Sequence, residues 1–401
     1  MRRIALTLLI LVLIVVSGAI YYKSGAPEKR PDRPLAELMA ARRAVDAARA
    51  EGYREVRDRF ILRLEAKIAA ARKSREAAPP TIDLLVISGG GDWGAFGAGV
   101  LKGWGRVKGE LARPQFDLVT GVSTGALIAP FAFLGDDASI DRIVHLYRNP
   151  RVDVAVSRRY AFFLPNNPSF FVLPGLEREL RTALDRSVLE RIAAEQAAGR
   201  MLFVNTTNID LGQLHVWDIV AEAKSALASN DEERVRRILL ASAGIPGAFP
   251  ARGIGEYLYV DGAITGNILF VARAQEEERL LARWKEKHPT VPPPRFRYWV
   301  IFNNQFRFPP QVTQENWPDI MNRATIMATQ TSTVNSMRHL FAMAEIAKLK
   351  RGADVQVRIM AVPEDWVPRQ PGTFVKEVMN DLADLGERMG ADPASWRTDP
   401  P

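Results

Sequence analysis

The segment Gly121-Val122-Ser123-Thr124-Gly125 places a serine between two glycines in the pattern GxSxG. In this pattern the serine lies on a sharp turn between a strand and a helix, and its small neighbours allow the strained backbone. An apolar stretch at 116–123 ends at Ser123, and a helical stretch begins at Thr124. The hydroxyl is therefore expected at a helix amino terminus, where negative charge is favoured. These features indicate a nucleophile for acyl transfer.

A second glycine-rich segment, GGGDWG at 89–94, follows an apolar run at 81–88. Backbone N–H groups in such a turn can stabilise the negative oxygen that forms during acyl transfer, because they need no reorganisation. We therefore take Gly89, Gly90 and Gly91 as candidate donors. The segment, which ends at Gly94, also matches the GxGxxG pattern of dinucleotide sites. That alternative is disfavoured because no acidic residue closes a second strand about 20 residues later.

A serine nucleophile needs a base, and the chain has four histidines: His145, His215, His288 and His339. The last two follow Asp261 and could complete the chain order Ser, Asp, His, but neither lies in a loop that would present an imidazole. A carboxylate can replace the imidazole if burial raises its pKa. Asp261 is the best-placed carboxylate, because it ends an apolar strand and Gly262 permits a tight turn. The alternative is an ordinary turn aspartate.

The elements that position these residues alternate between short apolar runs and helical stretches. The runs predicted as strands are 81–88, 116–123, 201–209, 256–262 and 297–304. This alternation predicts an α/β fold with a mostly parallel central sheet and helices on both faces. We expect the catalytic domain at 81–310. Residues 311–401 show helical patterning without a chemical motif, so we expect a helical C-terminal extension there.

Three ordered motifs resemble the patatin-like phospholipase family over roughly residues 82–270: the turn at 89–94, GVSTG at 121–125 with its glycines Gly121 and Gly125, and Asp261-Gly262-Ala263. The segment ASAGIPGAFPARGI at 241–254 adds to the resemblance. It implies a three-layer fold and a lipid acyl hydrolase. It also implies Ser123 as nucleophile, Asp261 as base without a histidine, and an oxyanion hole from Gly89, Gly90 and Gly91. Such chemistry uses no metal and no organic cofactor.

Two positions depart from the family pattern. Trp93 stands where a basic residue is common, and Ile268 follows Asn267 where proline is usual. The first departure leaves open a membrane-anchored protein of the same fold that binds lipid with little turnover. A third hypothesis is a Ser-His-Asp esterase that uses His288 or His339.

The charge and the leader point to a membrane surface. The 401-residue chain carries a net charge of +8, and residues 1–76 hold 17 Lys/Arg against 9 Asp/Glu while the remainder holds 37 of each. The basic excess therefore belongs to the leader and the segment after it, which favours anionic lipid over nucleic acid as a partner. The absence of cysteine excludes disulfides and thiolate chemistry. Nothing in the sequence indicates an oligomeric state.

Residues 1–23 begin Met-Arg-Arg and continue as an apolar run of a length close to that of a transmembrane helix. They are predicted to be an uncleaved anchor or a cleaved signal peptide. In either case the basic start places the body on the outer side of the membrane, anchored there or secreted. The localisation is then periplasmic or otherwise extracytoplasmic.

Residues 24–80 are predicted as a linker followed by a basic amphipathic helix or helical pair, interrupted near Gly52. This segment is expected to pack on the catalytic body or form a stalk, or else to lie with its basic face on anionic lipid. A second segment, YAFFLPNNPSFFVLPG at 160–175, is too apolar for an ordinary exposed loop. We expect it to pack against the core or to form a lid beside the site.

Overall fold

The computed structural model describes residues 2–24, 30–74, 79–158, 167–270 and 274–401. Within these residues the apolar runs form one eight-stranded sheet, in the order β10-β9-β1-β2-β5-β8-β7 with β6 paired to β5. Its strands are β1 (Thr81–Ile87), β2 (Leu118–Gly121), β5 (Met201–Asn208), β6 (Gln213–Asp218), β7 (Arg252–Ile254), β8 (Tyr257–Asp261), β9 (Arg295–Phe302) and β10 (Asp354–Ala361). A separate antiparallel pair consists of β3 (Val156–Ser157) and β4 (Phe171–Val172).

The sheet is mostly parallel, as predicted. Strands β10, β9, β1, β2 and β5 run parallel to one another, and all five strands expected from the sequence are present. Strands β6 and β8 run antiparallel to β5, and β7 pairs antiparallel with β8. A tight turn at Gly255 connects β7 to β8. The parallel strands β1 and β2 end at the same edge of the sheet, where Gly89 and Ser123 follow them.

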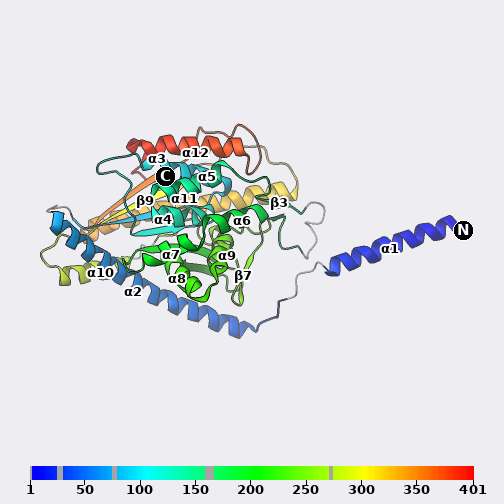
Figure 1. Ribbon diagram of the computed structural model, residues 1–401, viewed down its shortest axis with the longest axis horizontal. Coiled ribbons are helices and arrows are strands. Elements are labelled where there is room, and N and C mark those ends of the chain that lie inside the picture. Colours follow the sequence, from blue (N-terminus) through cyan, green and yellow to red (C-terminus); the bar gives the residue numbers. More distant parts are fainter. Residues whose placement is uncertain (1, 25–29, 75–78, 159–166, 271–273) are drawn as a thin grey trace.

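Helices cover both faces of this sheet, which gives the expected three layers (Figure 1). The helices on the first face are α3 (Gly94–Trp104), α4 (Thr124–Leu134), α5 (Asp137–Arg148), α6 (Pro174–Ala183), α7 (Arg186–Ala194), α8 (Ile219–Ser229), α9 (Glu232–Ser242) and α12 (Lys376–Ala391). Those on the opposite face are α2 (Leu35–Ser74), α10 (Ala274–Lys287) and α11 (Trp317–Arg351). Short 3-10 turns are η1 (Gly91–Trp93), η3 (Gly262–Ile264) and η4 (Pro393–Ser395).

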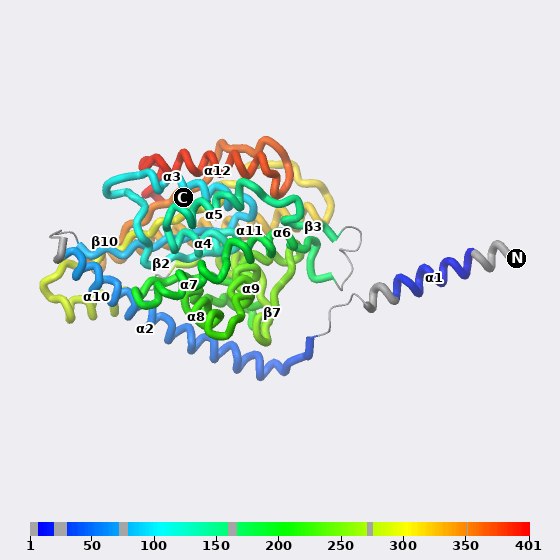
Figure 2. Tube along the Cα trace, in the orientation of Figure 1, coloured from blue at the N-terminus to red at the C-terminus, as the bar shows by residue number. Residues whose placement is uncertain are grey.

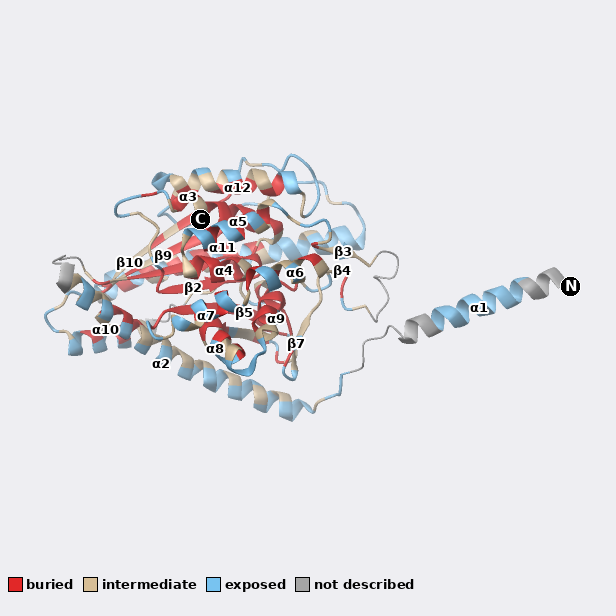
Figure 3. Cartoon of the chain, in the orientation of Figure 1, coloured by how far each residue is buried: buried red, intermediate tan, exposed pale blue. Residues whose placement is uncertain are grey.

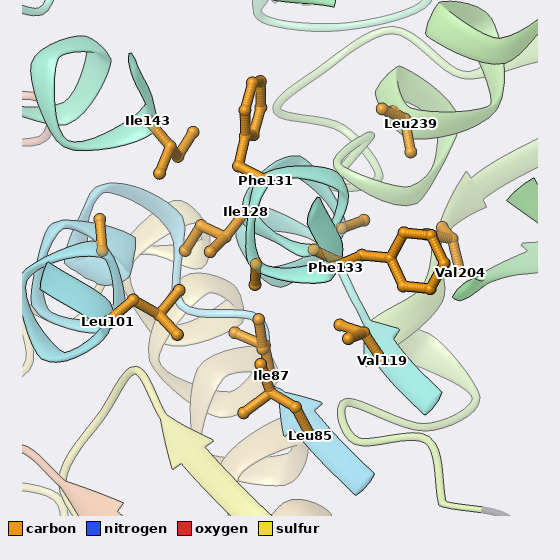
Figure 4. Packing of buried hydrophobic residues seen from close by; sticks show 14 of the residues in the cluster. Leu85, Ile87, Leu101, Val119, Ile128, Phe131, Phe133, Ile143, Val204 and Leu239 are labelled. Atoms are coloured by element: carbon orange, nitrogen blue, oxygen red, sulfur yellow. The ribbon is translucent and has the colours of Figure 1, made fainter. Parts of the chain in front are cut away.

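The two faces of β1 separate the two hydrophobic cores, because successive side chains of a strand point to opposite sides. Leu85 and Ile87 pack into the first core with residues of α3, α4 and α9 (Figure 4). Leu84 and Val86 pack into the second core, against α2, α10 and α11. Figure 3 shows buried residues concentrated in the sheet and along the helices that cover it. A strand buried on both faces reads as a continuous apolar run, which explains why β1 was recognisable in the sequence.

The apolar leader forms helix α1 (Arg2–Ser24), which extends away from the body (Figure 2). Residues 8–16 of this helix are exposed. Within the described part of the chain, no helix meets the length and apolarity that crossing a membrane requires. Anchoring, cleavage and localisation stay predictions.

Helix α2 is one continuous helix, so the predicted interruption near Gly52 is wrong. The cost of a glycine within a helix, about 1 kcal/mol, is offset here by contacts along the body. Arg63 and Lys67 both pair with the fully buried Asp117 carboxylate, at 2.7 Å and 2.6 Å. Before the helix, Arg30 forms a bidentate pair with Asp210, at 2.8 and 2.7 Å. The packing of this segment on the body, one of the two predicted alternatives, is therefore observed.

The C-terminal region differs from the predicted helical extension. Besides α11 and α12 it contributes β10, which pairs with β9 over eight residues. Helix α12 packs closely on α3, where a Cβ atom on Gly99 would lie 2.1 Å from the carbonyl oxygen of Ala383. Residues 354–391 are thus part of the sheet and its covering layer. Of the predicted lid segment at 160–175, residues 160–166 lie outside the described residues.

Candidate active site

Ser123 lies between β2 and α4 in a strained backbone conformation, with φ 54° and ψ −123°. A positive φ is uncommon for a residue with a side chain and persists only where its surroundings impose it. Its backbone N–H donates to Ser242 Oγ at 3.0 Å, and the Ser242 hydroxyl donates to the carbonyl oxygen of Asn205 at 2.7 Å. Ser242 of α9 and Asn205 of β5 therefore hold this turn in place.

The glycines of GVSTG are required by close backbone contacts. A Cβ atom on Gly125 would lie 2.3 Å from the carbonyl oxygen of Ile87, and one on Gly121 would lie 2.3 Å from that of Gly125. Real Cβ atoms do not approach a backbone this closely. The two glycines thus let α4 start directly above the end of β1, which brings Ser123 to the glycine turn at 89–94.

The glycine turn approaches Ser123 from the neighbouring strand end. The Gly89 N–H donates to Asn267 Oδ1 at 2.9 Å, and a Cβ atom on Gly89 would lie 2.9 Å from Ser123 Cβ. Gly90 packs against the backbone of Asn303, and Gly91 has φ 61°. Among the described residues no acceptor is found for the N–H groups of Gly90 and Gly91. Of the three predicted donors, the structure therefore leaves these two amides available.

Gly94 begins α3 and permits its contact with α4. A Cβ atom there would lie 2.1 Å from Thr124 Oγ1 and 2.7 Å from the Tyr147 hydroxyl. These two hydroxyls share a hydrogen bond. The lack of a side chain at Gly94 thereby lets the start of α3 approach the amino terminus of α4.

Asp261 ends β8 and is 2% exposed. Burial raises its pKa from 3.8 to about 7, while the N–H of Ala263 and the hydroxyl of Ser123 donate to the carboxylate and oppose the rise. The bond from Ala263 is 2.8 Å long. A carboxyl group with a pKa near 7 can both accept and return a proton near neutral pH. The structure places Asp261 buried, at the tight turn that begins with Gly262, and its role as the base stays a prediction.

Gly262 has to be a glycine because of Asn205. A Cβ atom at this position would lie 1.9 Å from Asn205 Oδ1. The amide nitrogen of the same asparagine donates to the carbonyl oxygen of Gly266 at 2.9 Å. Asn205 therefore fixes the turn after Asp261 and, through the bond from Ser242, the turn of Ser123 as well.

A pocket of about 780 Å³, including its open mouth, leads to Ser123. Apart from Gly91, Ser123 and Thr124, its lining is almost entirely apolar: Leu127, Phe131, Ile143, Leu146, Tyr147, Pro150, Val154, Leu176, Glu179, Leu180, Ala243, Ile245, Phe249, Phe374 and Met379. The only carboxyl group in this lining belongs to Glu179, whose pKa is raised mainly by burial. Such a pocket favours an apolar chain over a polar or charged ligand.

The histidines take other roles. His215 packs against Trp217 and Tyr259, and burial lowers its pKa to about 4. His288 contacts Glu65 at 3.2 Å, and His339 packs near Phe270. His145 is bonded to Asn149 at the end of α5. In the described part of the chain none of the four is bonded to Ser123 or Asp261.

Sequence reasoning missed the residues that support the site. Ser242 lies in the segment 241–254 of the resemblance but was given no role, and Asn205 and Asn303 carry no local motif, because each of the three acts on a backbone group far away in the sequence. Asn303, for example, donates to the carbonyl oxygen of Ser88 at 2.9 Å from the end of β9. The described residues contain no cluster of three side chains suited to hold a metal ion.

Comparison with known proteins adds three findings. Residues 85–272 match the family model of patatin-like phospholipases. No curated protein sequence matches the chain significantly. Among solved structures, the crystal structure of VipD from Legionella pneumophila is similar at 12% identity with a TM-score of 0.36, over 80% of this chain and 68% of that one. A likeness at that score supports no detailed argument.

Proposed function

We propose that the chain is a serine acyl hydrolase that cleaves carboxylic esters of membrane lipids. The match of residues 85–272 to the family model of patatin-like phospholipases supports this proposal. The observation that carries the proposal is the strained Ser123 turn beside a buried carboxyl group whose pKa lies near 7. The strained turn exposes the Ser123 hydroxyl to the pocket. Asp261 supplies a base whose pKa lies close to neutral pH, where proton transfer in both directions is efficient.

In the first half of the reaction, Asp261 accepts the proton of the Ser123 hydroxyl as Oγ attacks the ester carbonyl carbon. The resulting oxyanion accepts hydrogen bonds from the N–H groups of Gly90 and Gly91. The N–H of Gly89 instead donates to Asn267 and so positions the turn. Asp261 then returns the proton to the leaving alcohol as the ester C–O bond breaks. An acyl-serine remains in the pocket.

In the second half, Asp261 accepts a proton from water, whose oxygen attacks the acyl carbon. The second oxyanion collapses, Ser123 recovers its proton from Asp261, and a fatty acid leaves. The α4 amino terminus at Ser123 favours the negative charge at both stages. No step calls for a metal or an organic cofactor.

The lipid substrate is supported by the pocket. Its side chains, including Leu127, Phe131 and Phe249, offer contacts to a long hydrocarbon chain. Burial of such a chain contributes about 0.8 kcal/mol per methylene. We further propose that the leader brings the body to an extracytoplasmic membrane surface, where lipid is supplied.

The decisive experiment compares purified wild type, Ser123→Ala and Asp261→Asn on a panel of phospholipids and neutral acyl esters. Wild type should release fatty acid, and both variants should lose at least about a thousandfold in kcat. A fluorophosphonate probe should label wild type at Ser123 and label Asp261→Asn far more slowly. His339→Ala serves as a control that should keep full activity.

Two results would overturn the proposal. Ester hydrolysis that survives in folded Ser123→Ala would exclude this nucleophile. A wild-type protein that binds lipid but neither hydrolyses esters nor reacts with the probe would instead be a lipid-binding protein of this fold.

A further inference from the structure

The loop 363–375, which connects β10 to α12, is attached to the glycine turn at two points. The carboxylate of Asp92 accepts the backbone N–H of Phe374 at 2.8 Å. The indole of Trp93 packs edge-on against Trp366, with ring centroids 4.9 Å apart and planes at 84°. Asp92 and Trp93 directly follow Gly91. The turn that carries the candidate oxyanion donors therefore also holds this loop.

The first part of the loop is fixed from the other side by two buried glutamines. Gln305 Nε2 donates to the carbonyl oxygens of Pro363 and Trp366, each at 2.7 Å. Gln330 of α11 in turn donates to the carbonyl oxygen of Gln305 at 2.5 Å. Hydrogen bonds from the side chain of Gln305 to these carbonyl oxygens thus hold Trp366 in place. This position brings its ring into contact with Trp93.

The second part of the loop reaches the substrate pocket. Phe374 lines it together with Ser123, and its ring lies 6.3 Å from that of Phe249. Its backbone has φ 59°, a conformation that residues with a side chain rarely adopt. Strain of this kind persists where the surroundings impose it. Here the bond to Asp92, which is 8% exposed, holds the residue in that conformation.

We propose that the loop 363–375 is a specificity-determining wall of the acyl pocket, and that Asp92 is the positioning residue that fixes this wall to the glycine turn. The inference rests on the proposed function for the identity of the chain in the pocket, a long acyl group. The ring of Phe374 contacts that chain, whereas Asp92 contacts no substrate and acts through Phe374 and through the turn.

This arrangement gives Trp93 a role. A tryptophan replaces the basic residue that is common at this position, and its ring is used for packing on Trp366. Asp92 and Trp93 thus attach the turn to the loop at two adjacent positions. A shift of the loop therefore shifts the turn, and substrate fit becomes coupled to the position of the Gly90 and Gly91 amides.

A binding experiment tests the wall without turnover. In the Ser123→Ala background, palmitate binding is measured by calorimetry for Phe374→Gly and for Val367→Ala. Glycine takes a positive φ without strain, so this change removes the ring without a backbone cost. We expect Phe374→Gly to weaken palmitate binding about tenfold, since a phenyl contact is lost. Val367, which is 70% exposed on the same loop, is the matched control and should have no effect. Equal affinity in all three proteins would refute the wall.

A kinetic experiment tests the positioning role, with p-nitrophenyl acetate and p-nitrophenyl palmitate as substrates. Asp92→Ala should lower kcat at least about tenfold for both esters, because the turn loses its support. Asp92→Asn keeps an acceptor oxygen and should retain at least about a third of the wild-type kcat. Phe374→Gly should raise the KM for the palmitate ester about tenfold and the KM for the acetate ester far less, because the acetyl group has no long chain to contact the ring. Folding of each variant is checked by its unfolding midpoint.

The outcomes separate this inference from the proposed function. If Asn and Ala at position 92 are equally impaired while both proteins are folded, or if Phe374→Gly affects both esters alike, the inference fails and hydrolysis by Ser123 stands. If Ser123→Ala keeps its activity, the proposed function fails. The effect of Phe374→Gly on palmitate binding would then still show whether the loop 363–375 forms a wall of the pocket.

Discussion

Replacing Asp261 with asparagine should abolish activity and at the same time stabilise the protein at neutral and higher pH. Burial raises the pKa of this carboxyl from 3.8 to about 7. Between these two pH values the folded protein keeps a proton that the unfolded chain has released, so the free energy of unfolding of the wild type falls as pH rises. The asparagine variant has no such proton to lose.

The magnitude follows from the shift. One pKa unit corresponds to about 1.36 kcal/mol, so roughly three units give about 4 kcal/mol as the full effect. The difference in unfolding free energy, variant minus wild type, should therefore increase by up to about 4 kcal/mol from about pH 4 to about pH 7 and stay constant above that. Asparagine keeps the acceptor for the N–H of Ala263, so the turn itself is retained.

Urea unfolding followed by tryptophan fluorescence measures this difference, with both proteins in the same detergent at a series of pH values. All other titrating groups are common to the two proteins and cancel. Ser123→Ala is the matched control, since it is equally inactive but keeps the carboxyl group and should keep the wild-type dependence on pH. A difference between Asp261→Asn and wild type that does not change with pH would refute a buried, uncharged Asp261.

Three further predictions concern the same elements. The kcat/KM for a soluble ester should rise with pH, tenfold per unit, and level off near pH 7, as Asp261 loses its proton; a profile that is flat from about pH 5 to 8 would contradict a carboxylate base. Ser123→Gly should be inactive yet more stable than wild type by about 1 to 3 kcal/mol in chemical unfolding, because φ 54° costs glycine nothing; equal or lower stability would mean that the turn is unstrained. Arg63→Ala should lower the free energy of unfolding by about 1.5 to 3 kcal/mol, since Oδ1 of the fully buried Asp117 carboxylate loses the guanidinium while Lys67 still pairs with Oδ2. Lys67→Ala, which removes the more exposed partner, should cost less.

The parts of the site that could be read from the sequence are those in which local residue type and local backbone are linked. A strained turn needs small neighbours, so Gly121 and Gly125 mark Ser123 in five residues. A strand that is buried on both faces has a continuous apolar sequence, so β1 can be predicted together with the glycine turn that follows it. Because no histidine is suitably placed in the sequence, a carboxylate is expected as the base, and Asp261 is the best-placed one.

Other parts depend on contacts between distant residues and could not be read in this way. The bond from Phe374 to Asp92 joins residues 282 positions apart, and although Asp92 lies in the glycine turn, Phe374 belongs to no motif. The apolar pattern of β8 does not encode that this strand runs antiparallel to β5. The course of α2 through Gly52 depends on ion pairs such as that of Lys67 with Asp117.

Strand β10 has a pattern of alternating residues in the sequence that is typical of a strand. Val355, Val357 and Ile359 alternate with polar residues at 354–358, which is the period of a half-buried strand. The longer helical stretches before and after it favour the prediction of a helical extension for this region. The alternation also has a structural reason, because an edge strand exposes more of its side chains than a central one.

The place of β10 and α12 at positions 354–391 affects the order of events during synthesis. Nucleophile, base and glycine turn are all translated before residue 354, but the helix that covers α3 and the residues Phe374 and Met379 of the pocket come later. A ribosome adds about 5 to 20 residues per second, so a nascent chain spends seconds with its reactive serine made and its pocket incomplete. On the proposed function, the acyl pocket of the nascent chain is therefore completed only after its nucleophile and base have been made.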